Sequence, residues 1–158
     1  MVQLGTDGFD IIKVYPEVLS KNLLTEISIK SMPFGAKNGD FTTTTVARNN
    51  TISSYVFSSP SNQFRDNVAS IIAIFSNMEY NPELIQQIFS LIINKIKETD
   101  KDIITTVSKN LENIFRGFSK DTIKIKLESN KNVELKLDRL LSSKTQKVVK
   151  SFKDDIWA

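Results

Sequence analysis

The chain has 158 residues, 40% of them hydrophobic and 25% charged, which suits one globular domain or one domain with an appendage. It contains no cysteine and no histidine, which excludes disulfides, thiolate zinc sites, cysteine nucleophiles and histidine-based catalysis. The net charge of +3 comes from 17 lysines and only four arginines against 18 acids, a balance that argues against specific nucleic-acid binding. Because the first residues lack a signal-peptide pattern and no apolar run is long enough to cross a membrane, we expect a cytoplasmic location.

The first predicted elements are a strand and a helix. Residues 9–15 are rich in β-forming side chains and end at Pro16, which predicts a strand. Proline suits the first turn of a helix and an acid suits its amino end, so Pro16 and Glu17 predict a helix over residues 17–31. Pro33 and the loop 35–40 would end it.

A hairpin and a buried strand are predicted next. Residues 41–47, with four consecutive threonines, and residues 51–58 favour two strands, and the Arg-Asn-Asn sequence at 48–50 favours a tight turn between them. Residues 67–76 form the most apolar segment and predict a central strand, although a short apolar run does not exclude a helix.

Two amphipathic helices are predicted after this strand. Asn81 and Pro82 are a natural N-cap and first residue, and an apolar stripe at helical spacing follows them. A second helix is predicted to start near Asp100 or Asp102 and to end near Gly117, where a C-cap glycine belongs.

The last forty residues differ from the rest in pattern and charge. Alternating apolar and charged residues predict a hairpin of strands 122–128 and 133–138, followed by a helix over residues 139–156. Residues 119–158 carry ten cations and six acids, so their net charge is +4 and that of the first 118 residues is −1. We therefore predict two parts, 1–118 and a basic C-terminal extension, 119–158.

No group of residues predicts catalysis or a bound cofactor or metal. The loop 35–40 has two glycines and a lysine, but a phosphate-binding loop needs Gly-Lys-Ser/Thr leading into a helix, and here a strand is predicted to follow. The hydroxyls of residues 42–45 would be nucleophiles only beside a base, so a solvent-facing strand is the simpler interpretation. We expect the protein not to be an enzyme.

The candidate contact residues lie in the C-terminal extension. Lysines recur every three residues on the predicted final helix, and a tryptophan lies next to the last residue: Lys144, Lys147, Lys150, Lys153 and Trp157. A basic amphipathic helix binds anionic membranes, so peripheral membrane or polyanion binding is one hypothesis. The alternative is a helix that packs on its own domain and leaves its lysines in solvent.

The order strand, helix, hairpin, apolar strand and two helices resembles that of the longin-like, or SNARE-like, domains of the roadblock–longin superfamily. Residues 4–12, followed by Val14, Tyr15 and Pro16, are similar to the start of the archaeal members, in which a short turn leads into a strand that ends in Tyr-Pro. Residues 55–57 and 65–75 are similar to their later strands.

The resemblance covers residues 1–118 and implies an α+β fold. In that fold an antiparallel sheet of about five strands has one helix on one face and two on the other, with two strands before the first helix. Here only one strand is clear before residue 16, and residues 2–4 are the candidate for the other. The hairpin and helix of the extension are additions to that fold.

The function implied by the resemblance is non-catalytic protein binding. Such domains scaffold or regulate small GTPases and membrane-trafficking assemblies, and they pair with each other or with other proteins through a sheet edge or a helix. We therefore expect an adaptor or regulator that binds a small GTPase or a trafficking assembly, without cofactors.

Overall fold

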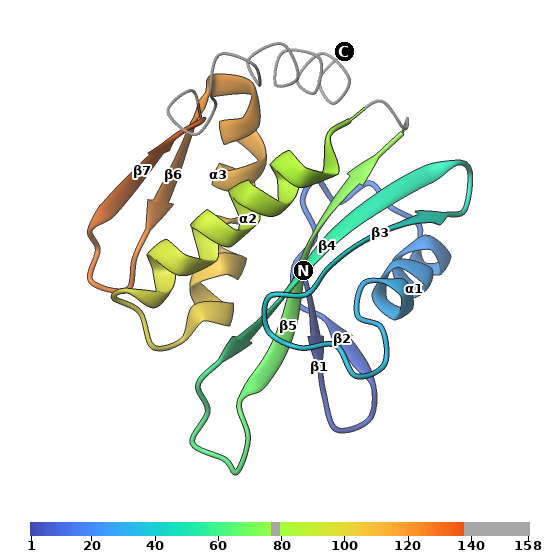
Figure 1. The fold of residues 1–158 in the computed structure, drawn as a ribbon, viewed down its shortest axis with the longest axis horizontal. Helices are drawn as coiled ribbons and strands as arrows, with labels where there is room; N and C mark the ends of the chain where they lie inside the picture. Colours follow the sequence, from blue (N-terminus) through green and yellow to red (C-terminus); the bar gives the residue numbers. More distant parts are fainter. Residues whose placement is uncertain (77–79, 138–158) are drawn as a thin grey trace.

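The computed structural model describes residues 1–76 and 80–137 of the chain (Figure 1). It is an α+β fold with a five-stranded antiparallel sheet, a two-stranded sheet and three helices among these residues. In chain order the elements are β1 (Val2–Leu4), β2 (Phe9–Ile11), α1 (Lys21–Lys30), β3 (Phe41–Val46), β4 (Asn50–Ser59), β5 (Asn67–Phe75), α2 (Pro82–Lys97), α3 (Ile103–Lys120), β6 (Thr122–Lys126) and β7 (Asn132–Lys136).

The large sheet has the strand order β2-β1-β5-β4-β3. β5 lies in its centre, as the apolar run predicted, and pairs along its whole length with β4, from Asn67 opposite Ser59 to Phe75 opposite Thr51. On its other side it pairs with β1, which has only three residues. The predicted short first strand is therefore present.

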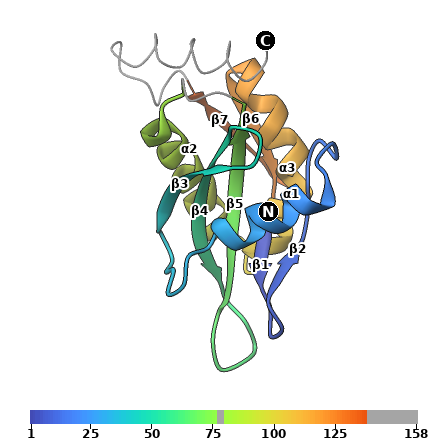
Figure 2. The same cartoon turned by 90° about the vertical axis from the view of Figure 1, so that its right-hand side faces the viewer.

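The helices cover the two faces of the large sheet unequally. Figures 1 and 2 show α1 on one face and α2 and α3 on the other. Ile27 of α1 packs with Ile52 of β4 in the smaller apolar core. The larger core joins α2 and α3 to the opposite side of β4 and β5, and it continues into the small sheet through Ile123 and Ile125.

The predicted boundaries of the first strand and first helix were wrong. β2 ends at Ile11, which pairs with Val2. Only Met1 precedes Val2, so β1 has almost no further residue with which a longer β2 could pair. α1 begins at Lys21, since the hydroxyl of Ser20 accepts a hydrogen bond from the Leu23 amide (3.3 Å) and so caps the helix four residues after Pro16.

The later helix starts were predicted correctly, but the end of α3 was not. Asn81 caps α2 by accepting from the backbone amide of Glu83 (3.0 Å), and Asp102 caps α3 by accepting from that of Thr105 (3.1 Å). Gly117 is buried inside α3, and the left-handed residue that ends the helix is Asp121, with φ of 59°. Gly117 is needed for close packing, because a Cβ there would lie only 2.8 Å from the Ile123 Cα.

Both predicted hairpins are present. The β3–β4 turn places Arg48 and Asn49 at positive φ, and β6–β7 buries Ile123 and Ile125 while Lys124 faces solvent. The β6–β7 hairpin packs on α3 and shares the larger core. The division of the chain at residue 118 stays a prediction, and the helix predicted over residues 139–156 lies outside the described residues.

Candidate functional site

The central strand β5 is paired over only part of its length on the β1 side. Val2 lies opposite Ser70, and β5 continues for five residues beyond this pair, to Phe75. On that side no residue of the described segments 1–76 and 80–137 forms a strand pair with residues 71–75. Ile72 and Ile74 are accordingly only half-buried, although they lie in the middle of the sheet.

The unpaired stretch of β5 leaves a gap on the β1 side of the strand. The hydrogen bonds of Met1 show which backbone groups of β5 face this gap. Its carbonyl accepts from the Ile12 amide (3.0 Å) and its amine donates to the Lys13 carbonyl (2.8 Å), so Met1 bonds toward the β2 side. Because bonding direction alternates along an antiparallel strand, Val2 bonds toward Ser70. By the same alternation, the N–H and C=O groups of Ile72 and Ile74 point away from β4, into the gap.

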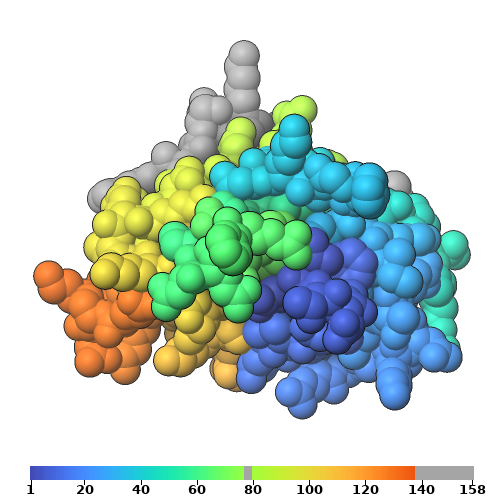
Figure 3. All heavy atoms as spheres, turned by 90° about the horizontal axis from the view of Figure 1, so that it is seen from below, coloured from blue at the N-terminus to red at the C-terminus, as the bar shows by residue number. Residues whose placement is uncertain are grey.

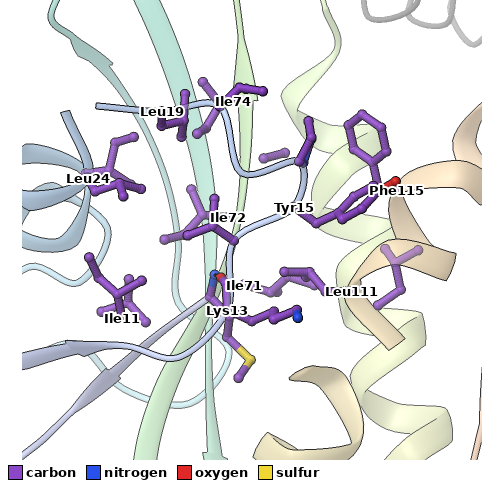
Figure 4. Close-up of a pocket in the computed structure, with 18 of the residues that line it drawn as sticks. Ile11, Lys13, Tyr15, Leu19, Leu24, Ile71, Ile72, Ile74, Leu111 and Phe115 are labelled. Atoms are coloured by element: carbon purple, nitrogen blue, oxygen red, sulfur yellow. Dashed lines mark hydrogen bonds between the residues drawn. The ribbon is translucent and has the colours of Figure 1, made fainter. Parts of the chain in front are cut away.

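An apolar pocket of about 320 Å³ occupies this position (Figure 4). One side is β5 from Ile71 to Phe75, and the other is the segment 13–16 that leads from β2 toward α1. We call the space between them the β5 slot. Its volume is at the lower end of the range found for ligand-binding cavities.

Apolar side chains line the β5 slot from both layers of the fold. Leu19, Leu24 and Ile27 belong to the α1 layer, and Leu111 and Phe115 come from α3. Lys13 is the one charged side chain among the described residues that line it. The other described lining residues are uncharged, and most of them are apolar.

Tyr15 attaches the outer wall of the slot to α3. Its ring packs edge-on against Phe115, with ring centroids 5.3 Å apart, and Figure 4 shows the two side chains pointing toward each other. Its hydroxyl accepts a hydrogen bond from Arg116 (3.1 Å), whose guanidinium also pairs with Glu112 (2.7 Å). The Tyr15 contact, and then the Glu112 charge, raise the pKa of Arg116 above its usual value.

The terminal amine of Met1 lies at the end of the slot. Met1 is buried, and burial lowers the pKa of its amine from 8.0 to about 5. The amine is therefore neutral at pH 7, which leaves the Lys13 ammonium as the positive charge beside this end of the slot.

The structure does not place the contact residues that were predicted from the sequence. Lys144, Lys147, Lys150, Lys153 and Trp157 all lie outside the described residues. Within the described part of the chain, no group of three or more potential metal-ligating acids occurs, and no helix is long and apolar enough to cross a membrane.

The loop 35–40 and the threonines at 42–45, which were considered as candidate sites, make structural contacts. The loop 35–40 connects α1 to β3, and the Asp40 carboxylate accepts from the Lys37 amide (2.7 Å). Thr42 and Thr43 share hydrogen bonds with the hydroxyls of Ser54 (2.9 Å) and Ser53 (3.0 Å) on the neighbouring strand. Thr43 and Thr45 are exposed, as expected for a solvent-facing strand, while Thr42 and Thr44 are half-buried.

Sequence reasoning did not find the β5 slot. The apolar run of β5 indicates burial on both faces, but the slot exists because β1 is short, and strand pairing is not visible in a local pattern.

In comparisons with known proteins, no protein-family model, no curated protein and no solved structure matches this chain.

Proposed function

We propose that the protein is a non-catalytic, longin-like interaction domain, an adaptor or regulator that binds a small GTPase or a membrane-trafficking assembly. The observation that carries this proposal is the architecture of the large sheet. Two strands precede the first helix, five antiparallel strands form the sheet, and one helix lies on one face with two on the other. That is the arrangement that the resemblance of residues 1–118 implies.

Exposed aromatic side chains support a role in binding proteins. Phe34 and Phe64 are both fully exposed, at 109% and 112% of the reference area. Phe64 belongs to the β4–β5 loop, which projects beside the N-terminal strands in Figure 3. Aromatic residues are enriched in protein interfaces, and large exposed ones have a solvation cost that a partner removes.

The free strands at the borders of the large sheet provide a second route to a partner. β2 and β3 are its outer strands, and no other described strand pairs with their outer edges, although Lys30 of α1 donates to the Thr45 carbonyl of β3 (3.0 Å). An edge of this kind adds a strand from another chain, which would allow a homodimer or a heterodimer.

Binding to purified small GTPases would test the proposal. The full chain is titrated calorimetrically with several GTPases, each loaded with GDP or with a non-hydrolysable GTP analogue, and its mass is measured by analytical ultracentrifugation. We expect a complex with at least one of them that depends on the nucleotide state. A chain that stays monomeric and binds none of them in either state contradicts the GTPase assignment.

A pair of variants connects the binding to the exposed surface. Phe64→Ser removes a fully exposed ring, while Ile29→Ser removes a smaller exposed apolar side chain, 60% accessible, on α1 outside the β5 slot. We expect Phe64→Ser to weaken a complex formed through the β4–β5 loop by about tenfold or more, which corresponds to about 1.4 kcal/mol, with unchanged thermal stability. Equal effects of both variants would show that the loop is not the contact.

A further inference from the structure

We propose that the β5 slot binds an extended, uncharged apolar segment of a partner protein, which adds to β5 as a strand in line with β1. The inference rests on the proposed protein-binding role and specifies a site and a partner chemistry for it.

The backbone of β5 favours a peptide over other apolar ligands. The N–H and C=O groups of Ile72 and Ile74 point into the slot, as the register of Val2 opposite Ser70 requires. An acyl chain or a detergent would fill the apolar volume but leave these polar groups buried without hydrogen-bond partners, which is unfavourable. A strand would satisfy all four of them.

The dimensions of the slot set the length of the segment. β5 continues for five residues beyond Ser70, so a strand of about five residues, roughly 17 Å long, would cover it. The strand would lie between β5 and the segment 13–16, as β1 lies between β5 and β2 at the neighbouring pairs.

The walls of the slot set the sequence pattern of the segment. Side chains alternate between the two faces of a strand, so one set would meet Leu24 and Ile27 on the α1 side and the other would meet Leu111 and Phe115 on the α3 side. Because both sides are apolar, we expect consecutive apolar residues, as in a strand buried on both faces, instead of an alternating pattern.

The charge of the lining restricts the segment further. Lys13 is the only charged side chain among the described lining residues, and the structure records no ion pair for it with the described residues. The core of the segment is therefore uncharged, and an acidic residue flanking it fits beside Lys13.

The test uses a capped synthetic peptide with a core of five alternating isoleucines and valines, flanked by two serines on each side. Its binding to the full chain is measured by fluorescence anisotropy, and hydrogen exchange of the β5 amides is followed by NMR. In the free protein we expect the amides of Ile72 and Ile74 to exchange faster than those of Ile71 and Ala73, which bond toward β4. The peptide should slow the exchange of Ile72 and Ile74 by at least about tenfold.

A backbone-modified peptide is the matched control. Methylating alternate amides of the core on one edge keeps its side chains and removes the donors on that edge, so we expect affinity to fall by about tenfold or more when the methylated edge is the one that faces β5. Both edges are tested. Equal binding of the plain peptide and of both methylated forms overturns the proposal, as does protection of Ile72 and Ile74 in the free protein.

Protein variants locate the site. Leu111→Gln changes a half-buried residue of the slot, and Ile29→Gln changes an exposed isoleucine of α1 outside it. We expect only Leu111→Gln to weaken the peptide, with both variants still folded by circular dichroism. If both variants bind the peptide as the unchanged chain does, the slot is not the site.

Two further outcomes separate the alternatives. If sodium dodecanoate binds and the peptide does not, the pocket is a lipid site and the strand proposal is wrong. If a small GTPase binds the chain but the peptide does not, this inference fails while the protein-binding role stands; if the peptide binds but no GTPase does, the GTPase assignment is what fails.

Discussion

At the scale of single residues, the buried terminal amine of Met1 should make the stability of the protein depend on pH. The chain has no histidine, so the terminal amine is the group that ordinarily titrates between pH 5 and 8. Burial lowers the pKa of this amine to about 5 in the folded state, from 8.0 when exposed. Between these values the unfolded chain holds more protons than the folded one, so the free energy of unfolding should rise with pH and level off above pH 8.

We expect this rise to reach at most about 4 kcal/mol, measured by urea denaturation at a series of pH values. The control is the same chain acetylated at Met1, which has no amine to titrate. A slope between pH 5 and 8 that survives acetylation would show that another group is responsible.

Gly117 illustrates how a close contact overrides helix propensity. Alanine is normally the better helix residue, by about 1 kcal/mol. A Cβ at Gly117 would nevertheless lie 2.6 Å from the Ile123 Cγ1 and 2.8 Å from both the Ile123 Cα and the Thr122 carbonyl oxygen. Gly117→Ala should therefore destabilise the protein, by about 1–3 kcal/mol in chemical denaturation.

A second change tests the reason for that loss. Ile123→Ala removes the Cγ1 atom but leaves the Ile123 Cα and the Thr122 carbonyl oxygen in place, so Gly117→Ala should still lower stability when it is added to Ile123→Ala. No loss from Gly117→Ala in that background would mean that only the side chain of Ile123 opposes the new methyl group.

At the scale of the elements, Asn110 attaches the β6–β7 hairpin to α3. Its carboxamide accepts from the Lys126 amide (2.8 Å) and donates to the Lys126 carbonyl (2.9 Å), as a strand partner would. Asn110 is buried, with 1% of its surface exposed, so Asn110→Ala leaves two backbone groups without a partner. We expect a loss of about 2–4 kcal/mol by thermal or urea denaturation.

Asn113 provides the comparison on the same helix. It is exposed, so Asn113→Ala should leave stability within about 0.5 kcal/mol of the original. A loss at Asn110 no larger than the change at Asn113 would show that the bonds to β6 contribute little to stability.

At the scale of the whole molecule, the charge is unevenly distributed along the chain. Residues 1–118 carry −1 and residues 119–158 carry +4, and the lysines that recur at Lys144, Lys147, Lys150 and Lys153 belong to the basic part. The proposed alternative role, binding to anionic membranes, predicts co-sedimentation with phosphatidylserine vesicles that weakens as salt is raised from 50 to 500 mM.

Deleting residues 139–158 should abolish this co-sedimentation, and neutral phosphatidylcholine vesicles should not bind either form. Equal binding of the full and shortened chains to anionic vesicles would dismiss a role for the lysines and Trp157.

The sequence by itself determined the elements whose signals are local. The N-caps Asn81 and Asp102, the two hairpins and the apolar strand 67–75 were all predictable, because capping, turn and periodicity signals act over a few residues. It also excluded cysteine and histidine chemistry outright.

Only the tertiary structure decided how these elements meet. The place of Gly117 against β6 depends on which segments pack together. The same is true of the β5 slot. It exists because β1 has three residues and pairs with only one part of β5, which has nine. The two strands are far apart in the sequence, so the pattern of neither strand alone predicts this difference in length.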